Sequence, residues 1–552
     1  RFQGNFTGFI NDFVTYGTLN TNLGTLVTDL NMKLPKNGQP VYSGKISTTS
    51  FRLGEFINNP DIGVVAFTGN VKGRGFKLNE LDMNIDGTID RFEYGNYTYQ
   101  NITAKGRFNN KAFNGDFVIK DPNADLSLTG LISFEGKEPL FDLKADIVKA
   151  NLKELQLIKE DLSLSGQFNL RFSGRSIGDF LGNASIQNAT LLHNGQRLSF
   201  DSLVIHSRYD NGVRTFTARS NEFDATVTGQ FDLKSLPDAF TRFLHRYYPS
   251  YIKPPRTNIP NQNFTFEITT GVVEDYIKLI DTRLSGFNNS YLTGSLNLSA
   301  NSMTLDANVP FFSFDKYDFN DVQLKADGNF ERLLVDGQVI NTTISDTLNM
   351  PNTIFTIQAQ NDISDINITT SSNFAINQAN LSAQVKTFSN GVSIKFNPSS
   401  FVLNNKTWTI EEGGELDFRK NTVVQGHLVL REANQSIRLS THPSSIGDWS
   451  DLHIDLENIN LGDITPLFLK APRIEGLVSG ELMVEDPQKR FNISGAIAAD
   501  QVRIDNDSIG QIQGSVFYNN STGLLTAKGN NLDPEKKILF DLALDIKDPE
   551  NA

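Results

Sequence analysis

The sequence predicts an all-β protein: an elongated antiparallel sheet that forms a groove with an apolar interior and carries a few short helices. The first observation is that apolar and polar residues alternate with period two in short stretches along most of the chain. The second is that glycines recur on the apolar phase of this alternation. The third is a pattern of strands that recurs after roughly 100 residues, as in repeat architectures.

The alternation is clearest in "ADLSLTGLISF" (124–134), "LSLSGQFNLRF" (162–172), "FDATVTGQFDL" (223–233), "YLTGSLNLSA" (291–300) and "LVSGELMV" (477–484). It predicts strands with one dry face and one wet face. The residues that we expect to line the dry face are Leu126, Leu128, Ile132, Phe134, Leu162, Leu164, Phe168, Leu170, Phe172, Phe223, Val227, Phe231, Leu233, Leu292, Leu296, Leu298, Val478, Leu482 and Val484.

A glycine stands at an apolar position in each of these stretches: Gly130, Gly166, Gly229, Gly294 and Gly480. Glycine weakens a strand and buries no side chain, so its recurrence on this face calls for a reason. A curled sheet needs places to bend, and glycine permits bulges and removes side chains that would collide on the concave side. We therefore predict that these glycines mark bends; space for a ligand against the backbone and a chance recurrence are the alternatives.

Three similar stretches divide the chain: "FRLGEFI" (51–57), "ANLKELQL" (150–157) and "INLGDITPLF" (459–468), each followed by a strand with a central glycine. The predicted segments are an incomplete groove segment at 1–50, repeats at 51–149 and 150–252, a Pro-rich linker at 253–262, a diverged groove segment at 263–458 and a truncated repeat at 459–552.

Helical periodicity is scarce. It is strongest at 235–248, where Phe240, Phe243, Leu244 and Tyr247 share a face and Pro237 suits the first turn. The stretch 272–280 predicts a second short helix. We expect both helices to cap a sheet.

Composition excludes several classes of function. The net charge is −13, and no basic run is long enough to follow a phosphate backbone, so we expect no nucleic-acid partner. The absence of cysteine excludes disulfides, thiolate catalysis and cysteine zinc sites. No stretch reaches the roughly 18–20 apolar residues of a membrane span. Because the chain opens within a strand pattern, we expect any membrane anchor to lie outside it.

A dry face must be covered. Sandwiches or closed barrels would cover it with another sheet, but the predicted ~40 short strands would need several of them. Only one convincing linker is visible, so we favour one continuous sheet that curls into a trough.

The Gly-centred strands, the repeat, and the stretches "GRSIGDFLGNASIQNATL" and "FVLNNKTWTIEEGG" resemble the TamB/AsmA family of Gram-negative envelope proteins. The resemblance covers nearly the whole chain. It implies a β-taco groove in the periplasm, an inner-membrane anchor and an outer-membrane partner barrel of the BamA/TamA type. It also implies transport of phospholipids or other acyl lipids between the two membranes, with a link to outer-membrane protein assembly.

Motifs for catalysis are weak. "GRSIG" (174–178) matches a nucleophile motif around Ser176, but a polar turn replaces the required strand and helix. The six histidines show no metal-ligand spacing, and "DNDSIG" (505–510) lacks the later glutamate of a calcium loop. We expect a surface turn there, and no catalytic residue, metal or cofactor. A glycosidase carboxylate pair stays open on sequence alone.

Two alternatives to lipid conduction remain. A scaffold that guides the strands of outer-membrane barrels by edge pairing would use the same fold. A surface β-solenoid that binds polysaccharide would expose aromatic platforms, yet the chain has only two tryptophans, and Trp408 is expected in the groove or core.

Overall fold

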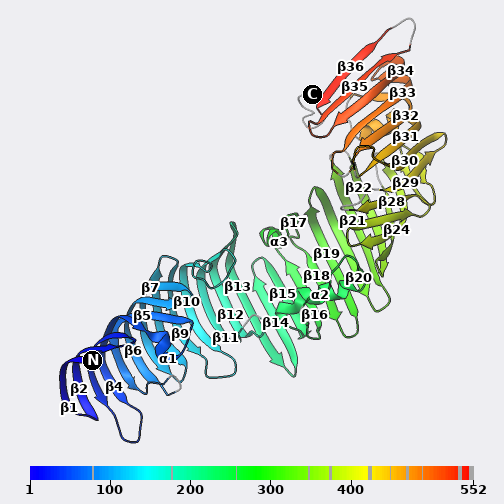
Figure 1. The fold of residues 1–552 in the computed structure, drawn as a ribbon. Coiled ribbons are helices and arrows are strands. Elements are labelled where there is room, and N and C mark those ends of the chain that lie inside the picture. The colour runs from blue at the N-terminus through cyan, green and yellow to red at the C-terminus, as the bar shows by residue number, and fades with distance from the viewer. Residues whose placement is uncertain are drawn as a thin grey trace. The chain divides into compact units, whose positions relative to one another are not determined.

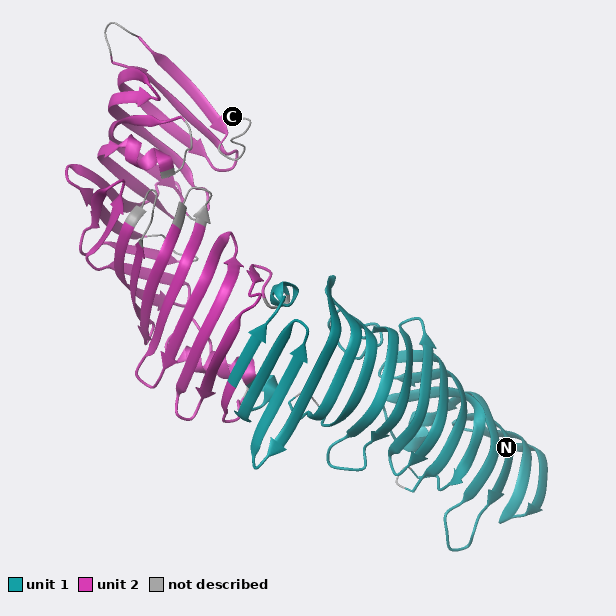
Figure 2. Ribbon diagram, turned by 180° about the vertical axis from the view of Figure 1, so that it is seen from behind, with its two compact units in different colours: residues 1–235, 266–279 teal, residues 236–265, 280–552 magenta. Residues whose placement is uncertain are grey.

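The computed structural model describes residues 1–545 except 78–79, 176–177, 257, 346–347, 372–375, 420–424, 448, 468–471, 488 and 533–536. The described residues form one antiparallel sheet of 36 strands with four short α-helices (Figure 1), which confirms the predicted all-β class. The chain divides into two compact units, residues 1–235 with 266–279 and residues 236–265 with 280–552 (Figure 2).

In unit 1 the strands follow one another side by side in chain order (Figure 2). They are β1 (Phe2–Phe9), β2 (Asp12–Thr21), β3 (Gly24–Lys33), β4 (Val41–Arg52), β5 (Ile62–Arg74), β6 (Asp82–Tyr94), β7 (Tyr97–Asn109), β8 (Ala112–Asp121), β9 (Ala124–Ser133), β10 (Leu140–Asn151), β11 (Leu162–Ser173), β12 (Leu181–His193), β13 (Gln196–Asp210), β14 (Val213–Ser220) and β15 (Phe223–Gln230). Strand β16 (Asn263–Thr270) contributes residues to both units.

Unit 2 continues the antiparallel pattern. Its strands are β17 (Leu284–Gly286), β18 (Tyr291–Asn297), β19 (Ser302–Phe314), β20 (Tyr317–Gly328), β21 (Leu333–Ser345), β22 (Leu348–Gln360), β23 (Ile363–Ser371), β24 (Ile376–Phe388), β25 (Gly391–Phe396), β26 (Ser399–Leu403), β27 (Lys406–Ile410), β28 (Glu415–Arg419), β29 (Gln425–Glu432), β30 (Gln435–Pro443), β31 (Ser450–Asn460), β32 (Ile474–Glu485), β33 (Asn492–Ile504), β34 (Asp507–Asn519), β35 (Leu524–Asn531) and β36 (Leu539–Asp545).

The strand connections in unit 1 follow local turn chemistry. Asn194–Gly195 and Asn211–Gly212 form two-residue loops at the ends of β12 and β13, and all four residues have positive φ. That geometry matches the twist of the flanking strands and favours Asn-Gly. Such turns fix the register of each hairpin.

The three similar stretches of the sequence occupy equivalent places. The stretches 51–57 and 459–468 contain helices α1 (Leu53–Ile57) and α4 (Leu461–Ile464), and 150–157 forms consecutive turns. Just before each stretch the strand register shifts, as at a β-bulge; the shifts fall between Thr48 and Phe51, Ile147 and Ala150, and Leu456 and Ile459. The bulge lets the chain leave the sheet and cover one margin of its apolar face.

Helix α2 (Leu236–His245) closes part of the apolar face of unit 2. Phe243 and Tyr247 are each only 1% exposed. The Phe243 ring lies over Gly328 of β20, and the Tyr247 hydroxyl donates to the Asn329 carbonyl at 2.5 Å. The predicted helix at 235–248 therefore packs on the sheet as expected. In the expected linker at 253–262, Ile259 and Gln262 are buried.

Helix α3 (Glu274–Ile280), which the stretch 272–280 predicts, covers a margin of the apolar face of unit 1. The Tyr276 ring packs edge-on against Phe200 and Phe223, with centroids 5.4 and 6.0 Å away. Burial there, with the nearby carboxylates of Glu222 and Asp275, raises the pKa of Tyr276 to about 12. The phenol therefore stays neutral as part of this contact.

Candidate functional site: an apolar face with a hollow

The apolar sides of the strands from β1 to β15 are in register with one another. One cross-strand row, the central row, passes through every strand from β1 to β15 without a break. Its members are Phe6, Thr15, Leu30, Gly44, Val71, Ile85, Gly106, Gly115, Gly130, Leu143, Leu170, Ala184, Ile205, Ala218 and Ala225. Thr15 is the only member with a polar side chain, so the unit carries a continuous apolar surface.

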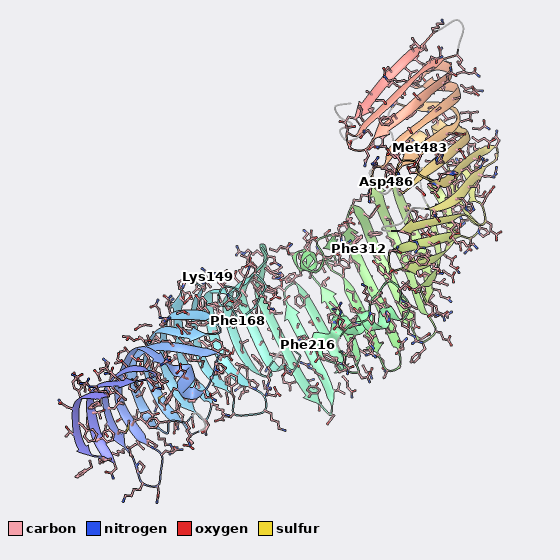
Figure 3. The ribbon with its side chains drawn as sticks, viewed as in Figure 1. Lys149, Phe168, Phe216, Phe312, Met483 and Asp486 are labelled. Atoms are coloured by element: carbon pink, nitrogen blue, oxygen red, sulfur yellow. The ribbon has the colours of Figure 1, made fainter. Side chains whose placement is uncertain are left out.

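A second row, the aromatic row, runs beside the central row. Its members are Gly8, Phe13, Met32, Tyr42, Gly73, Met83, Phe108, Phe113, Ile132, Phe141, Phe172, Gly182, Ser207, Phe216 and Val227. Figure 3 labels Phe216 on β14, and Phe168 of β11, which lies on the opposite side of the central row. Most members are half-buried, as expected where side chains of neighbouring strands contact one another on a curved sheet.

The apolar face is hollowed between β9 and β14. The hollow has a volume of about 770 Å³, and its wall includes Leu170 and Ile205 of the central row. The Phe141, Phe172 and Phe180 rings form a ladder, with centroid distances of 4.8 and 4.9 Å. The size lies within the range of about 300–1,000 Å³ that holds small ligands. This hollow is therefore a candidate apolar ligand site in unit 1.

Two cationic side chains line the hollow, Lys137 and Arg175. The Arg175 guanidinium donates to the Lys137 carbonyl at 2.6 Å and lies 3.5 Å from the Glu138 carboxylate. All three groups are exposed, so their mutual attraction is weak. Charged groups therefore stand among the apolar residues that line the hollow.

A buried arginine holds one wall of the hollow. The Arg214 guanidinium, 1% exposed, donates to the Gly178 and Phe180 carbonyls at 2.6 and 2.7 Å and to Ser207 Oγ at 3.0 Å. It also lies over the Phe231 ring. Burial lowers the pKa of Arg214. The guanidinium therefore fixes the turn that brings Phe180 onto the ladder.

Glycine is required where neighbouring strands come close together. Gly106, Gly115 and Gly130 are consecutive members of the central row. A Cβ on Gly115 would lie 2.2 Å from the Lys105 carbonyl oxygen and 2.5 Å from the Gly106 Cα. Gly130 also has a positive φ of 140°. Rings cover some of these glycines, as Phe113 covers Gly106.

The opposite face of unit 1 is polar. On it, Arg107 Nε pairs with Asp82 Oδ1 at 2.8 Å and Arg171 Nε pairs with Asp142 Oδ2 at 3.1 Å. The hydrogen bond from Arg107 lowers the pKa of Asp82. Exposed pairs of this kind add little stability, but they keep this face solvated.

The structure brings many of the predicted groove residues together on the open part of the apolar face in unit 1. Leu170 and Gly130 lie in the central row, and Ile132, Phe172 and Val227 lie in the aromatic row. Five more belong to this face or its margins: Leu128, Phe168, Phe134, Leu162 and Phe223.

Other predicted groove residues lie in closed cores, because helices and turns cover the margins of the face. Leu126 and Leu164 pack against the buried cluster of Ala124, Ala150 and Leu155. Leu296 is fully buried in the core of unit 2, where α2 packs. The remaining closed or half-buried positions are Phe231 and Leu233 in unit 1 and Leu292, Leu298, Val478, Leu482 and Val484 in unit 2.

The predicted bend glycines fall into two groups. Gly166, Gly229 and Gly480, like Gly130, have positive φ, a region that favours glycine. The register of β11 shifts beside Gly166, which marks a bulge. Gly294 pairs with Leu305 in a regular ladder.

Several lining residues of the hollow have no signal in the sequence. Phe180 follows a polar turn instead of a strand alternation, and it reaches the hollow through its stack on Phe172. Lys137 and Arg175 belong to two separate loops. Phe141 and Phe216 alternate within their strands, so a wider search for period two would have found them.

The weaker motifs have structural roles where they are described. Ser176 lies outside the described residues. The stretch 505–510 contains the turn between β33 and β34, and Trp408 is a core residue against Leu403 and Ile459. Over the described ranges, no three side chains of histidine, aspartate or glutamate are placed to bind a metal by themselves. None of the helices in this part of the chain has the length and hydropathy of a membrane crossing.

Neither a protein-family model, nor a curated protein, nor a solved structure matches the chain. The resemblance to the TamB/AsmA family therefore stays a prediction.

Proposed function

We propose that the protein conducts lipids by binding their acyl chains along the apolar face of its sheet, without catalysing a covalent reaction. The observation that carries this proposal is the central row, an apolar surface continuous over fifteen strands that opens into a hollow of about 770 Å³. A closed β core would explain single strands. It does not require a half-exposed apolar face of this length.

The energetics favour acyl chains as cargo. Each methylene group removed from water contributes about 0.8 kcal/mol, so one lipid tail in water costs roughly 10 kcal/mol. The backbone groups of neighbouring strands bond to each other, so the face offers mainly apolar side chains. Similar side chains recur at each strand, about every 4.8 Å, so a chain can shift along the rows without crossing a polar barrier.

We further propose that this conduction links the inner and outer membranes of a Gram-negative envelope. This location, the partner barrel and the link to outer-membrane protein assembly rest on the family resemblance alone. The acyl-chain surface is argued from the residues of unit 1, and it does not depend on the envelope location or on the partner barrel.

A photo-crosslinking experiment tests the proposal. A photoreactive amino acid replaces Phe168, on the apolar face of β11, and in a matched control replaces Gln167, its neighbour on the polar face. The protein is then mixed with phospholipid vesicles, illuminated and analysed by mass spectrometry. We expect phospholipid adducts at 168 and not at 167. Equal lipid labelling at both positions, or only protein adducts at 168, would contradict lipid conduction.

A further inference from the structure

The hollow in the apolar face of unit 1 reaches one edge of the sheet. Two loops contribute to its wall at this edge, residues 134–139 between β9 and β10 and the described residues of 174–180 between β11 and β12. The strand register brings these loops next to each other, because Leu140 pairs with both Ser133 and Ser173. The edge of the hollow is therefore built from two neighbouring loops.

The lining changes in character from these loops to the centre of the sheet. Its charged side chains, Lys137 and Arg175, both belong to the loops. The strand residues of the lining are Phe141, Phe172 and Phe216 of the aromatic row, and then Leu170, Ala184 and Ile205 of the central row. From the end of β11 to the central row is about 10 Å of strand. The hollow therefore has a cationic end and an apolar end, as an amphiphile has a charged and an apolar end.

The two cations are held at the edge of the hollow and remain accessible to an anion. Arg175 Nη2 donates to the Lys137 carbonyl at 2.6 Å, which ties the loops together. The Lys137 amine forms no ion pair with any residue that the structure describes. The Glu138 carboxylate, 3.5 Å from Arg175 Nε, is half-exposed, so it attracts the guanidinium only weakly. Asp179 accepts the Arg175 backbone N–H at 3.0 Å.

We propose that the hollow takes up amphiphiles with an anionic head group, a phosphate or a carboxylate. The head group lies against Lys137 and Arg175, and the tail points from the loops toward the central row. Guanidinium and ammonium groups both bind phosphate and carboxylate oxygens. No aspartate or glutamate stands among the described residues that line the hollow, so the charge of the lining is complementary to an anion.

This inference rests on the proposed function and gives the acyl-chain surface a point of entry. A tail in the hollow lies along the strands, whereas conduction along the central row crosses them. A lipid would therefore join the conducting surface from the side of the sheet, between the two loops. Each exposed ion pair strengthens binding at most about fivefold, so the tail supplies most of the affinity and the head group supplies the selectivity.

The first test is a calorimetric titration of the whole chain with dodecyl phosphate, dodecanoate, the neutral dodecyl glucoside and inorganic phosphate, all below micelle formation. We expect both anionic amphiphiles to bind about five- to tenfold more tightly than the glucoside, and inorganic phosphate not to bind. Equal affinity for the glucoside overturns the anion preference and leaves the acyl-chain surface intact. Inorganic phosphate that binds as tightly as dodecyl phosphate also overturns the proposal, because the tail then contributes nothing. If no alkyl compound binds, the proposed function itself is contradicted.

The second test removes both charges. The double variant Lys137→Gln with Arg175→Gln should lose the preference for dodecyl phosphate and should bind the glucoside as the original chain does. Lys36→Gln is the matched control, because Lys36 is an exposed lysine in the loop between β3 and β4, at the same edge and outside the lining of the hollow. An unchanged preference in the folded double variant overturns the assignment of these cations.

The orientation is tested on the original chain with dodecyl phosphate that carries a photoreactive diazirine at the end of its tail. After illumination and proteolysis, we expect adducts on peptides that contain Leu170 or Ile205. Adducts confined to residues 134–139 would place the tail at the loops and overturn the proposed direction of entry.

Discussion

Replacing Leu170 by arginine puts a guanidinium into the hollow, between Leu143 and Ala184 of the central row. An acyl chain that crosses the strands covers about 4.8 Å for each strand, which corresponds to about four methylene groups. At about 0.8 kcal/mol for each methylene, loss of contact over one strand costs about 3 kcal/mol. Acyl-chain affinity should therefore fall about a hundredfold.

The assay measures binding of a fluorescent phospholipid and its transfer between donor and acceptor vesicles. Asn169→Arg is the matched control, because Asn169 is exposed on the polar face of the same strand. Urea unfolding of both variants separates folding from binding. If folded Leu170→Arg binds and transfers lipid like Asn169→Arg, the hollow is not the acyl-chain surface and the reasoning fails.

Three further predictions concern the sheet and its caps. Phe243→Ala should destabilise unit 2 by about 3–5 kcal/mol, because the ring is fully buried under α2; urea unfolding measures this, and a loss below 1 kcal/mol would contradict the packing. Gly115→Ala should lower the free energy of unfolding by about 1–3 kcal/mol, because the new Cβ would press on the backbone of β7. Gly212→Ala is the comparison variant: Gly212 lies at an open turn, so its replacement tests φ strain without a steric contact. Tyr276 should ionise near pH 12 in an absorbance titration. Folding raises the pKa of Tyr276, so its contribution to the stability of the folded chain is full below about pH 10 and is lost as the pH rises through 12. Ionisation of Tyr276 near pH 10 would show that α3 is undocked.

The period-two alternation was sufficient to predict the strands and the two faces, because side-chain direction in a strand depends only on position parity. Helical periodicity, a separate signal, predicted the helix at 235–248, and the stretch 272–280 predicted a second short helix. The alternation did not predict the register between strands, because register depends on every turn and bulge between two strands. The central row could not be read from sequence, although each of its members stands in an alternating stretch.

Contacts between distant segments could not be predicted from the sequence either, because they also depend on strand register. His442 and His453 lie together because β30 and β31 pair with one particular register, and a slip of one residue between the two strands would place their rings on opposite faces. Phe180 lies on the ladder, and its carbonyl accepts a hydrogen bond from Arg214 of a later strand. The alternation predicted which side chains lie on the apolar face of the sheet. The pairing between strands determines which of those side chains line the hollow.

Gly229 shows how the sequence pattern and the pairing between strands combine at one residue. Its φ of 144° disfavours any other residue, and its cross-strand partner is Arg214. The glycine therefore leaves its own position on the apolar face without a side chain beside the buried guanidinium, which is committed to the wall of the hollow. We expect that a side chain at 229 would compete with Arg214, its cross-strand partner, for this space. If this is correct, Gly229→Ala should disturb the Phe180 segment before it disturbs β15, and hydrogen exchange at the Phe180 and Val227 amides can separate the two effects.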